Sequence, residues 1–124
     1  MISLKNIQTE VVQPLLDFFN GKQIYVHFEL TNGAYAAYRH GKFHAAGGYV
    51  RNARLNVLHG KIKGEDPYRV GLKTEDGWIF AEGLSMFERK ENESLYLYGF
   101  DEQGKLSVAL QLSTVPFEGG ILNE

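Results

Sequence analysis

The chain has 124 residues, of which 44% are hydrophobic, and it contains no cysteine. This length suits one compact domain, and the lack of cysteine excludes a disulfide framework, a thiolate nucleophile and Cys-based metal sites. The net charge of −2 combines a basic middle with an acidic end. Residues 39–73 carry eight basic and two acidic side chains, whereas residues 74–124 carry three basic and ten acidic ones. The near-neutral total therefore does not exclude an anionic partner.

The first predicted element is an amphipathic helix over about residues 7–20. Apolar side chains recur there at three- and four-residue spacing and form one stripe, and Asn20-Gly21 is suited to end the helix. Pro14 interrupts the pattern, so the helix either begins near Gln13 or is bent at Pro14. The N-terminus has no signal-peptide pattern and no apolar run reaches membrane-helix length, so we expect a cytoplasmic protein.

The chain from about residue 22 to residue 113 is predicted to form strands joined by short turns. Strand patterns cover residues 24–30, 34–39, 43–50, 54–63, 68–73, 78–88, 95–100 and 105–113. The apolar phase slips near His59-Gly60, which indicates a bulge or a bend that moves the strand between faces. Residues 78–84 are apolar on both faces, which is typical of a well-covered strand. About eight such strands predict a mainly β fold. We expect an antiparallel, barrel-like single domain over residues 1–124, with one N-terminal helix and a loose tail over 116–124.

The middle of the chain resembles a known family. The resemblance rests on residues 49–54 (YVRNAR), 61–64 (KIKG), 67–74 (PYRVGLKT) and 77–84 (GWIFAEGL). These runs are similar to the YojF-like family, small uncharacterised bacterial proteins, chiefly from bacilli, that also form a domain of unknown function. The resemblance implies a β-barrel-like fold and no assigned catalytic residues. It also implies a cytoplasmic accessory role beside a deacetylase of the LmbE type, linked to bacillithiol synthesis.

Catalytic motifs are incomplete in this sequence. Residues 99–105 fit the spacing G-x-x-x-x-G-K, but Leu106 stands where a phosphate-binding loop needs Ser or Thr, and a strand follows instead of a helix. We interpret this segment as a hairpin turn. Tyr25, His27 and Glu29 share one face of their predicted strand. They either face solvent or line a cavity, and a cavity would suit a small barrel enzyme or a cofactor binder.

A basic band is the leading candidate site. It consists of Arg51, Arg54, Lys61, Lys63, Arg69 and Lys73, which lie on consecutive predicted strands. Arginine suits carboxylate and phosphate groups, so we expect Arg51 and Arg69 to clamp an anion while Asn52 and Glu82 orient it. The alternative is that the band pairs with the acidic final third, either within one molecule or in a homo-oligomer.

The sequence thus predicts a non-catalytic binding module for an anionic small molecule or an acidic partner. Its candidate ligand-binding residues are Arg51, Asn52, Arg54, Lys63, Arg69, Lys73 and Glu82. Single-stranded nucleic acid is a lesser alternative, because the nearby aromatics Tyr49, Tyr68 and Trp78 stand in core phase. We expect no cofactor, no metal and no membrane partner.

Overall fold

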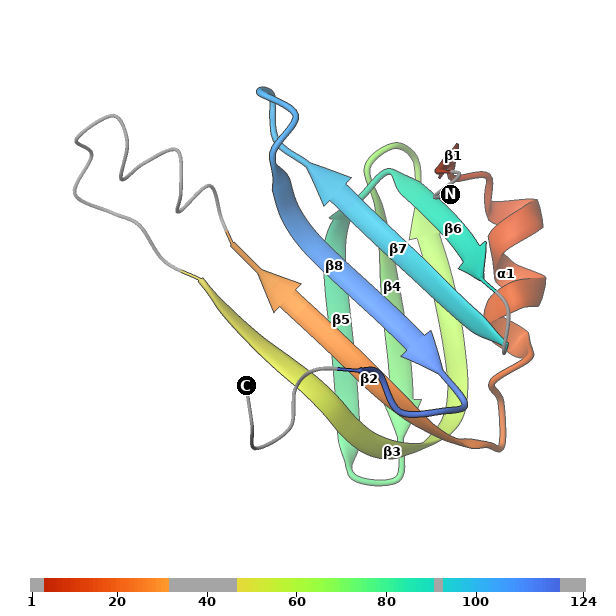
Figure 1. Ribbon diagram of the computed structural model, residues 1–124. Coiled ribbons are helices and arrows are strands. Elements are labelled where there is room, and N and C mark those ends of the chain that lie inside the picture. Colours follow the sequence, from red (N-terminus) through yellow and green to blue (C-terminus); the bar gives the residue numbers. More distant parts are fainter. Residues whose placement is uncertain (1–3, 32–46, 91–92, 119–124) are drawn as a thin grey trace.

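The computed structural model describes residues 4–31, 47–90 and 93–118. Within these residues, eight strands form one antiparallel sheet that carries one helix (Figure 1). The elements are β1 (Lys5–Asn6), α1 (Thr9–Asp17), β2 (Gln23–Leu30), β3 (Gly48–Gly64), β4 (Tyr68–Thr74), β5 (Gly77–Leu84), β6 (Met86–Lys90), β7 (Ser94–Phe100) and β8 (Leu106–Ser113). The strand order is β1-β6-β7-β8-β2-β3-β4-β5, so the sheet is barrel-like but not closed. The predicted fold class is confirmed.

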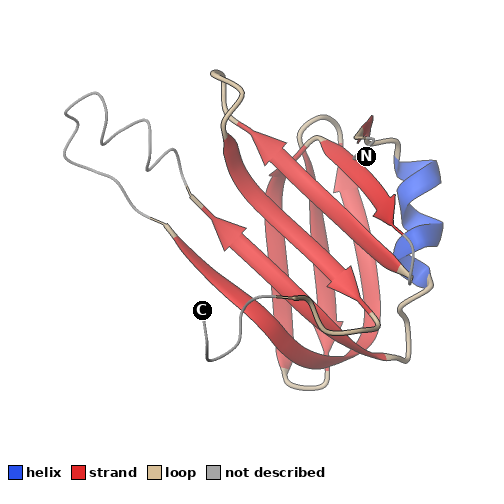
Figure 2. Cartoon of the chain, in the orientation of Figure 1, coloured by secondary structure: helices blue, strands red, loops and turns tan. Residues whose placement is uncertain are grey.

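The long strand β3 joins two layers of the sheet. Its first half pairs with β2 and its second half pairs with β4, so the sheet folds over and its strands cross in two layers (Figure 2). A register shift between Val57 and His59 turns the strand so that Val57 and Ile62 both face the core. The change of face predicted near His59-Gly60 is therefore confirmed, and it occurs at this register shift.

The core lies between the two layers. One layer contributes the buried residues Val26, Leu97 and Leu110, and the other contributes Val70 and Leu72. These are the positions of the period-two apolar pattern, because alternate side chains of a strand point to the same face. Each such burial stabilises the fold by about 1.5–3 kcal/mol.

Helix α1 flanks one side of the two layers (Figure 2). It begins at Thr9, so Pro14 lies inside it and the alternative start near Gln13 is wrong. The side-chain amide of Gln13 donates to the Gly60 carbonyl at 2.9 Å, and its oxygen accepts from the Ile62 N–H at 3.0 Å. The pairing of β3 with β2 ends at Asn56, and Gln13 satisfies backbone groups of β3 that lie after this point.

Two predicted segments differ from the structure. The single strand expected over 78–88 is divided, because Gly83 has a φ of +83° and the chain passes from β5 into β6 of the other layer. Arg89 and Lys90, which follow the strand predicted over 78–88, also belong to β6. The predicted strand 34–39 and the first half of the predicted strand 43–50 lie outside the described residues. No helix in the described ranges is long and apolar enough to span a membrane.

Candidate functional site

Basic and aromatic side chains share the outer face of β3, β4 and β5. The register aligns them across the strands as His59–Lys73–Trp78, Lys61–Gly71–Phe80 and Lys63–Arg69, with Glu82 on β5 beside the last pair. The alternate residues of the same strands face the core. We call this surface the basic–aromatic face; apart from Lys73, these residues line an open hollow of about 710 Å³.

The cations of this face lie close together, with the Glu82 carboxylate beside them. Lys63 and Arg69 stand directly opposite each other in the β3–β4 register, and like charges so placed repel. Within the described ranges, Lys61, Lys63, Arg69 and Lys73 form no ion pair. Among the described residues of one molecule, these four cations therefore do not form the ion pairs with the acidic final third that were expected as the alternative.

The aromatic part of the face consists of Trp78 and Phe80. Their side chains are exposed, at 52% and 60%, and their rings stack with centroids 5.3 Å apart and an interplanar angle of 5°. Gly71 makes room for them, since a Cβ there would lie 3.0 Å from Phe80 Cε1. Lys73 Nζ lies 5.8 Å from the centroid of the Trp78 ring. The rings and the cations therefore form one continuous surface.

This finding corrects the expectation that the aromatics belong to the core. Trp78 and Tyr49 are exposed, and β5 is covered on one face only. Tyr68 is half-buried and packs against the core, as expected. Residues 78–84 are apolar on both faces, but only Ile79, Ala81 and Leu84 turn inward. Apolar sequence alone does not prove burial, because exposed apolar side chains are common on protein surfaces.

Arg51 and Asn52 are engaged elsewhere, with the segment 114–118. The Asn52 side chain donates to the Phe117 carbonyl at 2.9 Å and accepts from the Phe117 N–H at 2.7 Å. Arg51 donates to the Glu118 carbonyl through Nε at 3.1 Å and also through Nη2. Phe117 is buried. The loose tail expected from residue 116 is therefore wrong for residues 116–118, because these contacts fix them on β3.

His27 lies between Arg51 and Glu29. Arg51 Nη1 is 3.2 Å from His27 Nδ1, and His27 Nε2 is 3.0 Å from Glu29 Oε1. Because a guanidinium only donates, this geometry assigns an unprotonated Nδ1 and an Nε2–H that donates to Glu29. Both ring nitrogens are thus occupied by protein groups. Tyr25 shares this outer face and stands opposite Arg54 in the β2–β3 register.

A polar row crosses the outer face of the other layer. The register places Glu88, Tyr96, Gln111 and His27 side by side on β6, β7, β8 and β2, beside a hollow of about 1090 Å³. Burial raises the pKa of the nearby Tyr98 above its ordinary range, although the hydrogen bond from Gln111 lowers it. Nowhere in the described ranges do three His, Asp or Glu side chains cluster as a metal site would require.

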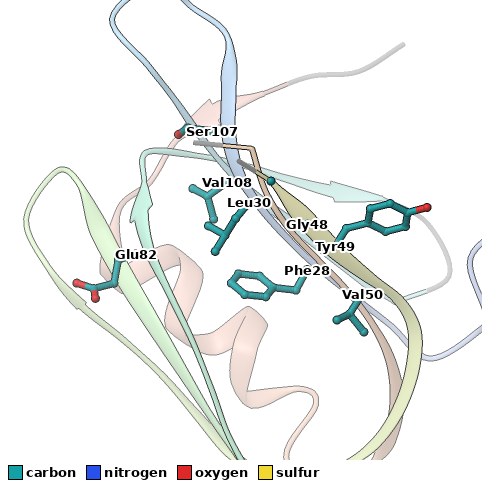
Figure 3. A pocket seen from close by; sticks show the side chains of 9 residues that line it. Phe28, Leu30, Gly48, Tyr49, Val50, Glu82, Ser107 and Val108 are labelled. Carbon is teal, nitrogen blue, oxygen red and sulfur yellow. The ribbon is translucent and has the colours of Figure 1, made fainter. Parts of the chain in front are cut away.

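A third, apolar hollow of about 600 Å³ opens where β2, β3 and β8 face β5. Figure 3 shows Phe28, Leu30 and Val108 turned toward one another, while Tyr49 points away from them. Glu82 lies on the opposite strand and borders both this hollow and the basic–aromatic face. Of the predicted ligand set, the structure brings together Lys63, Arg69, Lys73 and Glu82. It places Arg51, Asn52 and Arg54 outside that surface.

Comparison with known proteins gives a consistent result. Residues 6–117 match the family described as a protein of unknown function (DUF1806). The uncharacterized protein YojF of Bacillus subtilis (strain 168) is 43% identical over 114 residues, which cover 92% of this chain and 98% of that protein. The crystal structure of Bacillus subtilis YojF superposes with a TM-score of 0.78 at 39% identity, covering 94% of this chain and 99% of the other. The chain therefore belongs to the DUF1806 family, as the resemblance of its middle segments to YojF-like proteins implied.

Proposed function

We propose that this protein is a binding protein for an anionic ligand, which it takes on the basic–aromatic face. The observation that carries the proposal is the arrangement of Lys61, Lys63, Arg69 and Lys73 on one exposed face, with Lys63 directly opposite Arg69. Three cations line the hollow there against the single carboxylate of Glu82. An anion bound between Lys63 and Arg69 relieves their repulsion, and Arg69 offers a planar pair of donors.

Arg51 has no part in this proposal. Its guanidinium donates to Glu118 and to His27, so its role is to hold residues 114–118 against β3. The alternative of a catalytic or cofactor-binding cavity at Tyr25, His27 and Glu29 has less support, because both nitrogens of His27 are hydrogen-bonded within the protein.

The test uses the single tryptophan of the chain, because Trp78 lies on the proposed surface. Its fluorescence is followed while inorganic tripolyphosphate is added to the wild type and to the double variant Lys63→Ala/Arg69→Ala. Loss of two charge-assisted contacts is expected to weaken binding by about tenfold or more. The matched control is Lys5→Ala/Lys105→Ala, which removes two exposed lysines from β1 and from the turn after β7.

The control is expected to bind within about twofold of the wild type, since its charges lie outside the hollow. Equal affinity of the two double variants would contradict the proposal, and so would the absence of any fluorescence change with the wild type. Two further partners stay predictions: a deacetylase of the LmbE type, implied by the family resemblance, and a second copy of the chain, suggested by the basic band and the acidic final third. Binding of this chain to such a deacetylase is testable by co-purification of the two proteins.

A further inference from the structure

We propose that the anionic ligand is single-stranded nucleic acid, with bases stacked on Phe80 and Trp78 and phosphates held by Arg69 and the lysines of the neighbouring strands. This inference rests on the proposed function and names its ligand class. Three observations carry it: a ready stacking surface, a row of cations beside that surface, and the open form of the hollow.

The stacking surface is built by two side chains and a glycine. Phe80 and Trp78 are two residues apart on β5, and their rings are nearly parallel at 5.3 Å. Gly71 of β4 stands opposite Phe80 in the register, and its lack of a side chain leaves room for the rings beside it. More than half of each side chain stays exposed, although burial would stabilise the fold. Exposed aromatic rings on a sheet are the surface on which single-stranded bases stack, because every base has a flat π-face.

The cations lie where the phosphates of a stacked strand would pass. Lys73 is the cross-strand neighbour of Trp78, and its ammonium is 5.8 Å from the ring centroid. Lys61 is on the far side of Gly71 from Phe80, two strand spacings away, which is roughly 10 Å. Lys63 and Arg69 extend the positive surface along β3 and β4. All four cations therefore lie on β3 and β4, on the side of the rings that faces the middle of the sheet. A chain that stacks one or two bases on the rings can run its phosphates along this row of cations.

The same geometry favours a single strand over a duplex. In a duplex the base faces are already stacked inside the helix, and only their edges are accessible in the grooves. The basic–aromatic face offers ring faces on an open sheet surface. Nucleic acid also fits this face better than an inorganic or carboxylate anion does, because a simple anion would make no use of the exposed rings of Phe80 and Trp78.

The experiment measures fluorescence anisotropy of a short, fluorescein-labelled oligothymidylate with the full chain. The informative variant is Phe80→Leu, which keeps an apolar side chain but removes the ring. The matched control is Phe100→Leu, an aromatic of β7 that is 38% exposed and lies outside this face. Phe80→Leu is expected to weaken oligonucleotide binding at least about fivefold, whereas Phe100→Leu leaves it unchanged. Tripolyphosphate binding, followed by Trp78 fluorescence, is expected to stay within about twofold of the wild type for the control Phe100→Leu.

The outcomes separate this inference from the proposed function. If tripolyphosphate binds and Phe80→Leu leaves oligonucleotide affinity unchanged, the stacking inference is wrong and the anion site stands. If neither ligand binds, both proposals are wrong. Competition by duplex DNA as strong as that by the unlabelled single strand would overturn the inference. A thymidine mononucleotide that binds as tightly as the oligonucleotide would overturn it too, because the ligand would then be a free nucleotide. Thermal unfolding followed by circular dichroism verifies that each variant folds.

Discussion

The role of Asn52 gives the sharpest prediction about the fold. Its amide makes two hydrogen bonds with the backbone of Phe117, at 2.7 and 2.9 Å, and its own backbone has a φ of +60°. Each hydrogen bond contributes about 0.5–1.5 kcal/mol, so Asn52→Gly is expected to lower the free energy of unfolding by about 1–3 kcal/mol. Asn52→Ala loses the same bonds and adds the cost of a left-handed backbone with a Cβ, roughly 1 kcal/mol more.

The assay is urea unfolding of the wild type and the two variants, with tripolyphosphate binding measured in parallel. The account predicts the stability order wild type, Asn52→Gly, Asn52→Ala, and unchanged ligand affinity, because Asn52 lies away from the basic–aromatic face. An Asn52→Gly variant as stable as the wild type would refute the argument. A variant that keeps its stability but loses tripolyphosphate binding would restore the ligand-orienting role that the sequence predicts.

The remaining predictions concern the strand crossing, pH and salt. Gly99→Ala places a Cβ against the carbonyl oxygen of Gly83 and 2.7 Å from Val108 Cγ1, so urea unfolding should show a loss of about 3 kcal/mol or more. Because burial raises the pKa of Tyr98 above 10.0, the unfolded chain releases this proton at lower pH than the folded chain. The stability should therefore fall as the pH rises above about 10, and Tyr98→Phe should lose less stability between about pH 9 and pH 11 in urea unfolding. Oligonucleotide affinity should fall with salt, with a log–log slope of about −1.4 to −2.8 for two to four neutralised phosphates, measured by anisotropy titration.

Local periodicity predicted most of the strands. Ile24, Val26 and Phe28 alternate with polar residues, and β2 follows that pattern because one of its faces packs on the core. The same reasoning placed Arg69 and Lys73 on one face of β4, where the structure has them. Strand phase is reliable within one uninterrupted strand, since every second side chain points to the same side.

The composition of the site was harder to predict, because it depends on which strands are neighbours and where the register shifts. Arg51 and Lys63 belong to one strand, but the bend and bulge of β3 place them on the two different layers. The apolar pattern around Trp78 and Phe80 predicts a strand covered on both faces. The sequence does not show whether another element packs on the outer face of that strand, and in the structure none of the described elements does. The glycine at position 71, between basic residues, was the available signal, since a strand glycine often marks close approach by another group.

The docking of residues 114–118 had no periodic signal. Phe117 is an isolated aromatic after the last strand, and its burial depends on Asn52 and His27, which are distant in the sequence. Such contacts follow from the tertiary fold, so a pattern of a few residues does not predict them.

The central claim is that the outer face of β3, β4 and β5 is the ligand-binding surface. Its most direct test is a nitrogen–proton NMR titration of the labelled wild-type protein with tripolyphosphate and with the short oligothymidylate. The account predicts that amide shifts concentrate on Lys61, Lys63, Arg69 and Gly71 with both ligands. It predicts that the Trp78 indole N–H shifts strongly with the oligonucleotide. Shifts that concentrate on His27, Arg51 and Asn52 instead, with β4 and β5 unchanged, would contradict it.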